Sequence, residues 1–272
     1  MKQAGPITEL FAYRELLWML AWRDIRVRYK HTVLGAAWAV APPLLTMLIF
    51  VLVFRYALKV GNLTGDTGLP YPLFALIGLV PWTFFTSGLT GSVQSLVANR
   101  PLLTKIAFPR EVFPLSAVLS AAVDFLVALG VLAAVVAYFH FATAWSVAFD
   151  ARLLLLPVVI LVQVVLMAGL AFLLSMGHLF YRDVGHVVRA LLPLMMFVTN
   201  VVYPLKTANP TFNLLIHLNP MVPILDAYRA ALAPASPFPT TGLAYAGAVA
   251  AFLLVGGWTL FHRSEYEFAE RV

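Results

Sequence analysis

Long runs of apolar residues that are nearly free of charge constrain this chain more than any other feature. A helix needs about 20 apolar residues to cross the hydrocarbon layer of a membrane. Six runs meet or approach that length, at residues 32–54, 71–98, 112–139, 153–181, 187–205 and 241–261. Only 11% of the 272 residues are charged and 62% are hydrophobic, which is too little charge for a water-soluble surface. The sequence therefore predicts an all-α membrane protein with six transmembrane helices.

The fifth run is less regular than the others, because it is short and contains Arg189 and Pro193. The residues that follow, 207–225, are apolar but broken by proline and asparagine. Irregular backbone at membrane depth must be buried in protein or face a watery cavity, because lipid cannot hydrogen-bond to it. We therefore interpret residues 207–225 as a re-entrant segment near a polar pathway.

The distribution of basic residues indicates which side of the membrane the ends occupy. Six crossings place both termini on one side, and loops on the cytoplasmic side carry an excess of Lys and Arg. Thirteen basic residues fall on the side of the termini: Lys2, Arg14, Arg23, Arg26, Arg28, Lys30, Arg100, Lys105, Arg110, Arg182, Arg189, Arg263 and Arg271. Five fall on the other side: Arg55, Lys59, Arg152, Lys206 and Arg229. The sequence thus predicts a multi-pass protein of the inner (plasma) membrane with both termini cytoplasmic.

We expect one membrane domain. Residues 1–31 form a cytoplasmic interface helix, residues 32–262 a single six-span domain, and residues 263–272 a cytoplasmic tail. The first 31 residues carry six Lys or Arg and three acids, unlike the clean apolar core of a cleavable signal peptide. The absence of cysteine excludes disulfides and thiolate metal sites.

Residues 10–31 combine aromatic and basic side chains at helical spacing. One face carries Trp18, Ala21, Trp22, Ile25 and Tyr29, and basic residues project from the other sides. Such a helix is typical of the headgroup layer, where indole rings and cations are favoured. A simple orientation signal remains the alternative, because it needs the positive charges but not the aligned aromatics.

The loop between the second and third runs reads ANRPLLTKIAFPREVFP, at residues 98–114. Its prolines favour short helical turns. Its apolar side chains could form a cytoplasmic surface that docks a partner. These side chains are Leu102, Leu103, Ile106 and Phe108. A loop that hugs the membrane and only reverses the chain is the other reading, and the residues alone leave both open.

The chain has no sign of intrinsic catalysis. It contains no phosphate-binding loop and no Gly-Lys pair, so it cannot bind ATP by that mechanism. The 12 acids are scattered and the six histidines show no metal-ligand spacing, so we expect no catalytic residue and no metal site. The basic residues form no continuous stripe, which argues against nucleic-acid binding. Asp124 is the one acid inside an apolar run; it either acts in transport or is protonated or hydrogen-bonded within the bundle.

Four segments resemble a known family in order and separation. They read RYKHTVLGAAWAVAPP (residues 28–43), TKIAFPREVFP (104–114), FYRD (180–183) and NPMVP (219–223). The chain resembles the type-2 ABC exporter permeases of O-antigen, capsule and teichoic-acid polymers. This resemblance covers nearly the whole chain. It implies a permease subunit that moves lipid-linked polysaccharide across the inner membrane, with two short re-entrant helices within residues 207–231.

The same resemblance implies partners and site residues. ATP and Mg²⁺ would be bound by a separate ATPase subunit, this chain would bind no cofactor, and two copies would form a homodimeric channel. Residues that dock the ATPase would be Pro101, Leu102, Leu103, Lys105, Ile106, Phe108 and Arg110. Channel-lining aromatics would be Trp38, Phe50, Phe54, Phe197 and Tyr203, although lipid-facing or core packing is the alternative for each. The phosphate of the lipid headgroup would enter at Arg23, Arg26, Arg28 and Lys30.

Two other functions fit the sequence less well. A type-2 ABC exporter of a drug or another small substrate would share the fold but not the motifs. A membrane enzyme acting on polyprenyl-linked glycans would need acid pairs or His/Arg groups that the sequence does not offer.

Overall fold

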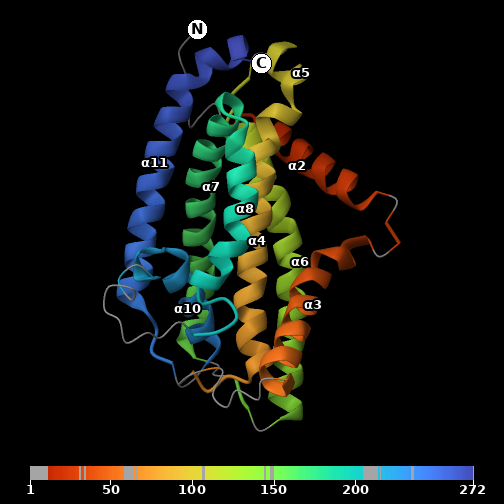
Figure 1. Ribbon diagram of the computed structural model, residues 1–272, viewed down its shortest axis with the longest axis vertical. Coiled ribbons are helices and arrows are strands. Elements are labelled where there is room, and N and C mark those ends of the chain that lie inside the picture. The colour runs from red at the N-terminus through yellow and green to blue at the C-terminus, as the bar shows by residue number, and fades with distance from the viewer. Residues whose placement is uncertain are drawn as a thin grey trace.

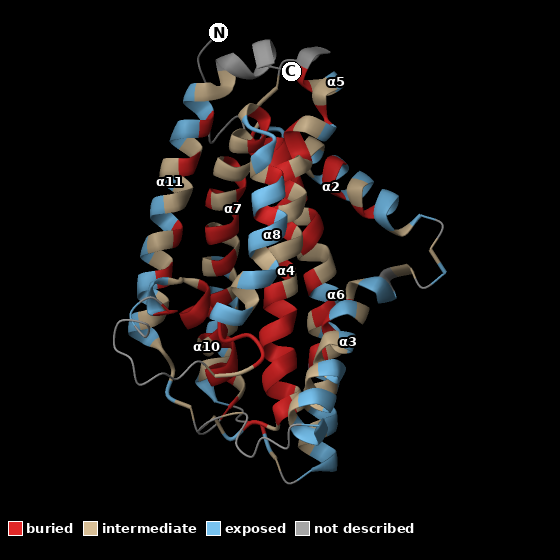
Figure 2. Cartoon of the chain, viewed as in Figure 1, coloured by how far each residue is buried: buried red, intermediate tan, exposed pale blue. Residues whose placement is uncertain are grey.

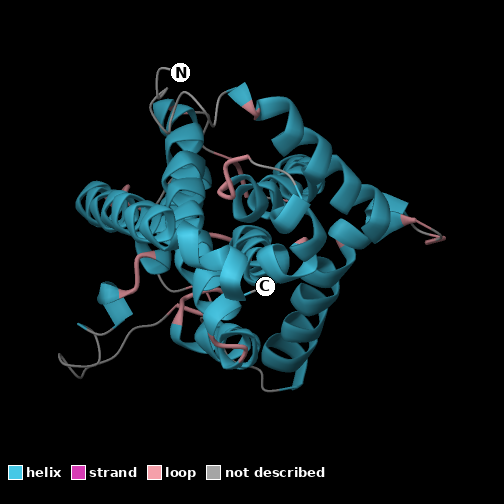
Figure 3. Cartoon of the chain, turned by 90° about the horizontal axis from the view of Figure 1, so that it is seen from above, coloured by secondary structure: helices cyan, strands magenta, loops and turns pink. Residues whose placement is uncertain are grey.

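The computed structural model describes residues 12–30, 32–33, 35–57, 64, 67–105, 108–143, 145–147, 150–204, 214, 216–233 and 236–271. Every regular element among these residues is a helix, and none of them forms a strand (Figure 3). This result confirms the all-α class predicted from the sequence.

Twelve helical elements are defined along these residues. They are α2 (Arg14–Tyr29), the 3-10 helix η1 (Gly35–Ala39), α3 (Ala41–Phe50), the π-helix η2 (Val51–Ala57), α4 (Tyr71–Ala98), α5 (Arg100–Lys105), α6 (Val112–Ala142), the 3-10 helix η4 (Ala151–Leu155), α7 (Leu156–Phe180), α8 (Asp183–Val198), α10 (Met221–Leu232) and α11 (Thr240–Arg271). Four of the helices are long and apolar enough to cross a membrane, at Tyr71–Ala98, Val112–Ala142, Ala151–Phe180 and Thr240–Glu265. A shorter apolar helix covers Ala41–Ala57.

The first predicted span is not one continuous helix. Gly35 has a left-handed backbone with φ of 51°, which glycine adopts without strain. Pro42 and Pro43 then stand in the first turn of α3, where proline is tolerated because its missing N–H has no partner in the helix. The helix that follows, Ala41–Ala57, has 17 residues and is about 26 Å long. The prediction of a continuous membrane-spanning helix from residue 32 was therefore wrong at its start.

The fifth predicted span is also shorter than expected. α8 begins earlier than predicted, at Asp183, and ends at Val198 rather than at residue 205. Residues 207–213, the first part of the predicted re-entrant segment, lie outside the described residues. Its later part becomes α10, of whose twelve residues ten are buried.

α4 is the central helix of the bundle. In the most apolar stretch of α4, 78% of the residues are buried, compared with 17% in the corresponding stretch of α11. Figure 2 shows this difference between the two helices. α11 packs against α7 at two glycines. A Cβ added to Gly169 of α7 would lie 2.5 Å from the backbone of Leu253 in α11, and a Cβ added to Gly257 of α11 would lie 2.6 Å from the backbone oxygen of Gly169. Small residues at such a crossing let two membrane helices approach closely.

The molecule has two distinct ends, which we name after the short helices found there. The α5 end carries α5, the start of α6 and the last turns of α11, and the α10 end carries α10 and the start of α11 (Figure 1). A separate apolar cluster lies toward the α5 end and includes Leu20, Leu103 and Phe113. α2 starts near the α5 end and slants outward along α6 (Figure 1).

The residues that were predicted to share one face of α2 are only partly buried together. Ala21 and Ile25 are buried, whereas Trp18 and Trp22 are exposed and stack on each other with ring centroids 6.1 Å apart. The aliphatic part of the face packs inward because α6 covers it, and the indoles project away from the bundle.

Candidate functional site

The main polar contact between α2 and the bundle is an ion pair. The Arg28 guanidinium donates to Asp124 Oδ2 through Nη1 and lies 3.4 Å from Ser120 Oγ through Nη2. The Tyr29 hydroxyl donates to Asp124 Oδ1 at 2.8 Å. Burial, together with the hydrogen bond to Asp124, raises the pKa of the Tyr29 hydroxyl to about 12, so this group stays protonated and continues to donate. Asp124 thus accepts from two consecutive residues of α2.

The other basic residues of α2 have different surroundings. Arg23 donates to its neighbour Asp24 through Nε and Nη2, at 3.0 and 2.8 Å. The Arg26 guanidinium lies over the ring of Trp22, 5.4 Å from its centroid, which is a cation–π geometry. Lys30 is exposed at the end of α2. The four predicted headgroup residues therefore lie along one short helix, but two of them are paired with carboxylates.

Two cavities adjoin Arg28. One, of about 440 Å³, lies between α2, α4 and α6 and is lined by Arg23, Asp24, Val27, Arg28, Gly91, Gln94, Ser95, Ala98, Asn99, Ala117 and Ser120. The other, of about 350 Å³, is lined by Arg28, Tyr29, Thr32, Trp38, Ala39, Pro42, Thr83, Ser87 and Asp124. Both combine charged groups with hydroxyl or amide groups, which is the chemistry that recognises phosphate.

The predicted docking segment packs against the C-terminal helix. The Arg110 guanidinium donates through Nη1 to the backbone oxygen of Glu265, and its Nε lies 3.7 Å from Glu265 Oε1. Glu111, only 4% exposed, accepts from Trp258 Nε1 at 3.3 Å and lies 3.2 Å from His262 Nδ1. Arg110 and Glu111 therefore tie the segment that joins α5 to α6 to the last turns of α11.

The described apolar residues of this segment are more buried than the sequence predicts. Leu103 is buried in the apolar cluster at the α5 end, and Leu102 and Phe108 pack against that cluster. Phe108 also contacts the Phe113 ring at 5.4 Å. Pro101 is exposed, whereas Ile106 and the side chain of Lys105 lie outside what the structure describes. The expectation that Leu103 is a surface docking residue was therefore wrong, because it fills the core beneath α5.

Three of the predicted channel aromatics lie next to one another. The rings of Phe50 and Phe54 stack 5.6 Å apart, and Phe54 lies 6.5 Å from the ring of Tyr203. The Tyr203 hydroxyl donates to the backbone oxygen of Phe197, whose side chain is exposed. Trp38 stands apart, beside the cavity that Asp124 lines. The structure thus groups Phe50 of α3 and Phe54 of η2 with Tyr203, which follows α8 and lies far away in the sequence.

A buried arginine holds α10 against α4 at the other end. Arg229 is 2% exposed and donates to the backbone oxygen of Val201 at 2.7 Å. Its guanidinium lies over the Phe74 ring, 3.8 Å from the centroid. Gly78 provides the space, because a Cβ there would lie 2.1 Å from the Val201 oxygen and 2.4 Å from Arg229 Nη2. The sequence predicts Arg229 only as one of the basic residues on the outer side and does not predict this anchor.

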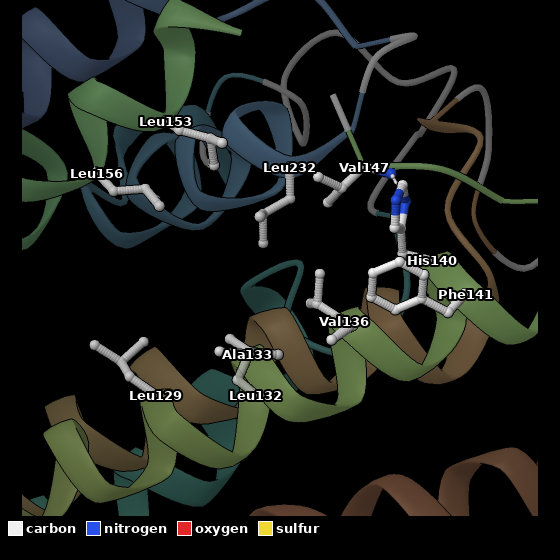
Figure 4. A pocket seen from close by; sticks show the side chains of 11 residues that line it. Leu129, Leu132, Ala133, Val136, His140, Phe141, Val147, Leu153, Leu156 and Leu232 are labelled. Atoms are coloured by element: carbon white, nitrogen blue, oxygen red, sulfur yellow. Dashed lines mark hydrogen bonds between the residues drawn. The ribbon is translucent and has the colours of Figure 1, made fainter. Parts of the chain in front are cut away.

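An apolar pocket of about 440 Å³ lies near the α10 end, between α6, η4, α7 and α10 (Figure 4). Its lining residues are aliphatic apart from Phe141 and His140, and His140 Nδ1 accepts from the Val147 backbone N–H at 3.2 Å. Side chains of this kind can hold a hydrocarbon chain but offer no group for phosphate or sugar.

Comparisons with known proteins agree across most of the chain. The ABC-2 type transporter family matches residues 15–233. The chain is 32% identical over 269 residues, 98% of each chain, to the O-antigen export system permease protein RfbA of Myxococcus xanthus. It is 29% identical over 259 residues, 94% of each chain, to RfbA of Klebsiella pneumoniae. It is 24% identical over 213 residues to the polysialic acid transport protein KpsM of Escherichia coli, covering 78% of this chain and 79% of that one.

Proposed function

Because the chain belongs to the ABC-2 type transporter family, we propose that it is the permease subunit of an exporter of lipid-linked polysaccharide, of the O-antigen or capsule type. The observation that carries the proposal is the similarity to an O-antigen export permease over 98% of both chains. The polymer would leave the cytoplasmic side of the inner membrane, and a separate subunit would hydrolyse ATP. ATP and Mg²⁺ would be bound there, and this chain would need no cofactor of its own.

We assign the α5 end to the cytoplasm. α4, α6, η4 with α7, and α11 supply four crossings, and we take Ala41–Ala57 and α8 as the two shorter ones. α10 then re-enters the membrane region from the outer side. Thirteen of the 18 basic residues fall on the α5 side in this arrangement, in agreement with the positive-inside rule. All six crossings form a single domain, residues 32–262, with α2 at the inner interface.

The ATPase would dock at the segment around α5. Pro101 is exposed and would contribute to its contact surface, where the sequence also predicts Lys105. Leu102 and Phe108 would support this surface through the apolar cluster, and Arg110 through its contacts with Glu265. The bonds of Arg110 and Glu111 to α11 give a direct path by which movement of this segment reaches the bundle. A closing motion of the ATPase subunits would thereby shift α11 together with α7.

The polymer path would lie where two copies of the chain meet. The exposed faces of α3 and α8 are apolar, with Leu45, Leu48, Leu191 and Leu194 among their exposed residues, and such faces need a lipid or protein partner. Phe50, Phe54, Phe197 and Tyr203 would line the channel. Flat rings make weak contacts with successive sugars and let a polymer slide.

The basic residues of α2 would receive the phosphate of the lipid carrier. Arg23, Arg26, Arg28 and Lys30 lie on the helix that slants outward from the bundle, within reach of headgroups in the cytoplasmic leaflet. Trp38 would stand at the passage from this region toward the channel, since it lines the same cavity as Arg28.

Loss of the chain tests this function in the cell. Deletion should remove the surface polysaccharide and leave lipid-linked polymer inside, and the wild-type chain should restore export. A Pro101→Asp, Lys105→Glu chain should reach the membrane but lose co-purification with the ATPase. The matched control is Pro237→Asp, an exposed proline near the α10 end, which should keep both. Normal surface polysaccharide after deletion would contradict the proposal.

A further inference from the structure

Asp124 is a carboxylate placed inside an apolar helix. It lies twelve residues into α6, about 18 Å along the helix axis, and its side chain is 14% exposed. Charged groups in such surroundings are costly unless paired. The partner comes from 96 residues away, since Arg28 of α2 reaches across to it. The end of α2 is thus held on α6 by opposite charges.

The cations around the larger cavity are all neutralised within the molecule. Arg23 is paired with Asp24, and Arg28 with Asp124. The cavity also offers the amides of Gln94 and Asn99 and the hydroxyl of Ser120. Its volume of about 440 Å³ falls in the range of small-ligand sites. An anion that binds here must therefore compete with the carboxylates that already hold the two arginines.

In the second cavity, Asp124 has polar neighbours other than Arg28. That carboxylate lines it together with the hydroxyls of Tyr29, Thr83 and Ser87. Tyr29 already donates to Asp124 Oδ1, so one hydrogen bond does not depend on the arginine. Arg28 lines both cavities and its side chain is 40% exposed, which leaves it free to turn from one to the other.

We propose that Arg28 is a shared cation, held by Asp124 in the unloaded permease and transferred to the phosphate of the lipid carrier when substrate binds in the cavity lined by Arg23 and Arg28. This inference rests on the proposed function and names the regulation of its headgroup site. A diphosphate carries more charge than one carboxylate and can accept two parallel hydrogen bonds from a guanidinium, so it can displace Asp124. Displacement would remove the ionic link between α2 and α6 and leave the hydrogen bond from Tyr29 to Asp124. Because only an anion can take Arg28 from Asp124, the exchange would admit only substrates with an anionic headgroup.

The test measures binding of farnesyl diphosphate to the purified permease–ATPase complex in detergent. Farnesol controls for the hydrocarbon tail, and inorganic diphosphate separates a free anion from a lipid headgroup. Asp124→Asn removes the competitor and should tighten farnesyl diphosphate binding about threefold to tenfold. Arg28→Gln should weaken it by at least as much. Neither variant should change the binding of farnesol.

Asp124→Asn leaves Arg28 without its carboxylate and could misfold for that reason, so a second variant that keeps the ion pair is needed. Tyr29→Phe keeps the ion pair but removes the hydrogen bond that would stabilise the released Asp124, so it should weaken farnesyl diphosphate binding about twofold to fivefold. Weaker binding in folded Asp124→Asn, or tighter binding in Tyr29→Phe, would overturn the exchange. Tight binding of inorganic diphosphate alone would replace the lipid headgroup with a free anion and would also overturn it.

The outcomes separate this inference from the proposed function. If export continues in cells but no variant changes farnesyl diphosphate binding, the exchange is wrong and the exporter assignment stands. If deletion of the chain leaves surface polysaccharide unchanged, the proposed function is wrong whatever the binding results.

Discussion

The two ends of the molecule hold their helices together in different ways. At the α5 end, contacts between distant segments join ionisable side chains to one another, as in Arg28–Asp124, Arg110–Glu265 and Glu111–His262. At the α10 end, the long-range hydrogen bonds of two arginines run to backbone oxygens instead, from Arg229 to Val201 and from Arg152 to Ser236.

This difference matters because the two kinds of contact respond differently to a ligand. A carboxylate that holds an arginine can be displaced by another anion, or the pair can separate when a partner pulls on one helix. A backbone oxygen is fixed by its own helix or turn, so its bond breaks only if the local fold changes. The ion pairs at the α5 end are therefore exchangeable, whereas the bonds from Arg229 and Arg152 to backbone oxygens at the α10 end are fixed by the fold.

The largest effect is expected at Gly78 of α4, which lies against the Val201 backbone oxygen and the Arg229 guanidinium. Gly78→Ala places a methyl group 2.1 Å from the Val201 oxygen, so backbone must move and we expect a loss of about 3 kcal/mol or more. Gly130→Ala is the matched control, because nothing lies within 4 Å of its Cβ and alanine favours the helix by up to about 1 kcal/mol. Chemical unfolding in detergent measures both. Equal stability of the two variants would break the contrast between fixed and exchangeable contacts.

The next effect concerns the arginine beneath that glycine. Arg229→Met keeps most of the volume but leaves the Val201 oxygen without its donor, which should cost about 2–3 kcal/mol of stability. Arg55→Met changes an exposed arginine of η2 and should stay within about 0.5 kcal/mol. Thermal unfolding in detergent compares the two. A cost at Arg229 no larger than that at Arg55 would mean that α10 is held by apolar packing alone.

A smaller effect on stability is expected where the docking segment meets α11. Glu265→Gln weakens the contact with Arg110, whose Nε lies 3.7 Å away, and should cost about 0.5–1 kcal/mol. The larger change should appear in the ATPase rate of the permease–ATPase complex, because movement would pass less directly to the bundle. Glu15→Gln, on the exposed start of α2, serves as the control. An ATPase rate that follows stability in both variants would remove the coupling role of this contact.

The smallest effect is expected at the exposed pair on α2. Arg23→Gln breaks a contact between adjacent residues in solvent, so stability should change by less than about 0.5 kcal/mol. Binding of farnesyl diphosphate should nevertheless fall about twofold, because Arg23 lines the cavity with Arg28. A variant with unchanged binding would restrict the phosphate site to Arg28.

The long apolar helices could be predicted because their signal is local. Residues 71–98 were expected to form one span, and α4 covers Tyr71–Ala98. The prediction of the first span was wrong at its start, because Gly35, Pro42 and Pro43 interrupt the helix although the surrounding residues are apolar. About two turns of the predicted α-helix are therefore absent, and the 3-10 helix η1 lies in their place.

The candidate site could be predicted only in its parts. The basic residues of α2 and the lone acid Asp124 were each identified, but not that Arg28 and Asp124 meet, because a pattern along the chain does not show which distant positions pack together. One signal was present: a carboxylate in an apolar helix requires a cation, and α2 carries the nearest unassigned cluster of them. No pattern in the sequence indicates that the Leu103 side chain packs inward, because other residues of the same segment are also apolar.

The most direct test of the exporter is transport itself. Inverted inner-membrane vesicles that contain the permease and its ATPase are supplied from outside with radiolabelled lipid-linked polysaccharide, and polymer protected from a glycosidase is measured with and without ATP. The account predicts ATP-dependent protection that is lost in the Pro101→Asp, Lys105→Glu variant and retained in Pro237→Asp. Protection that is the same without ATP, or that persists when the permease is absent, would contradict it.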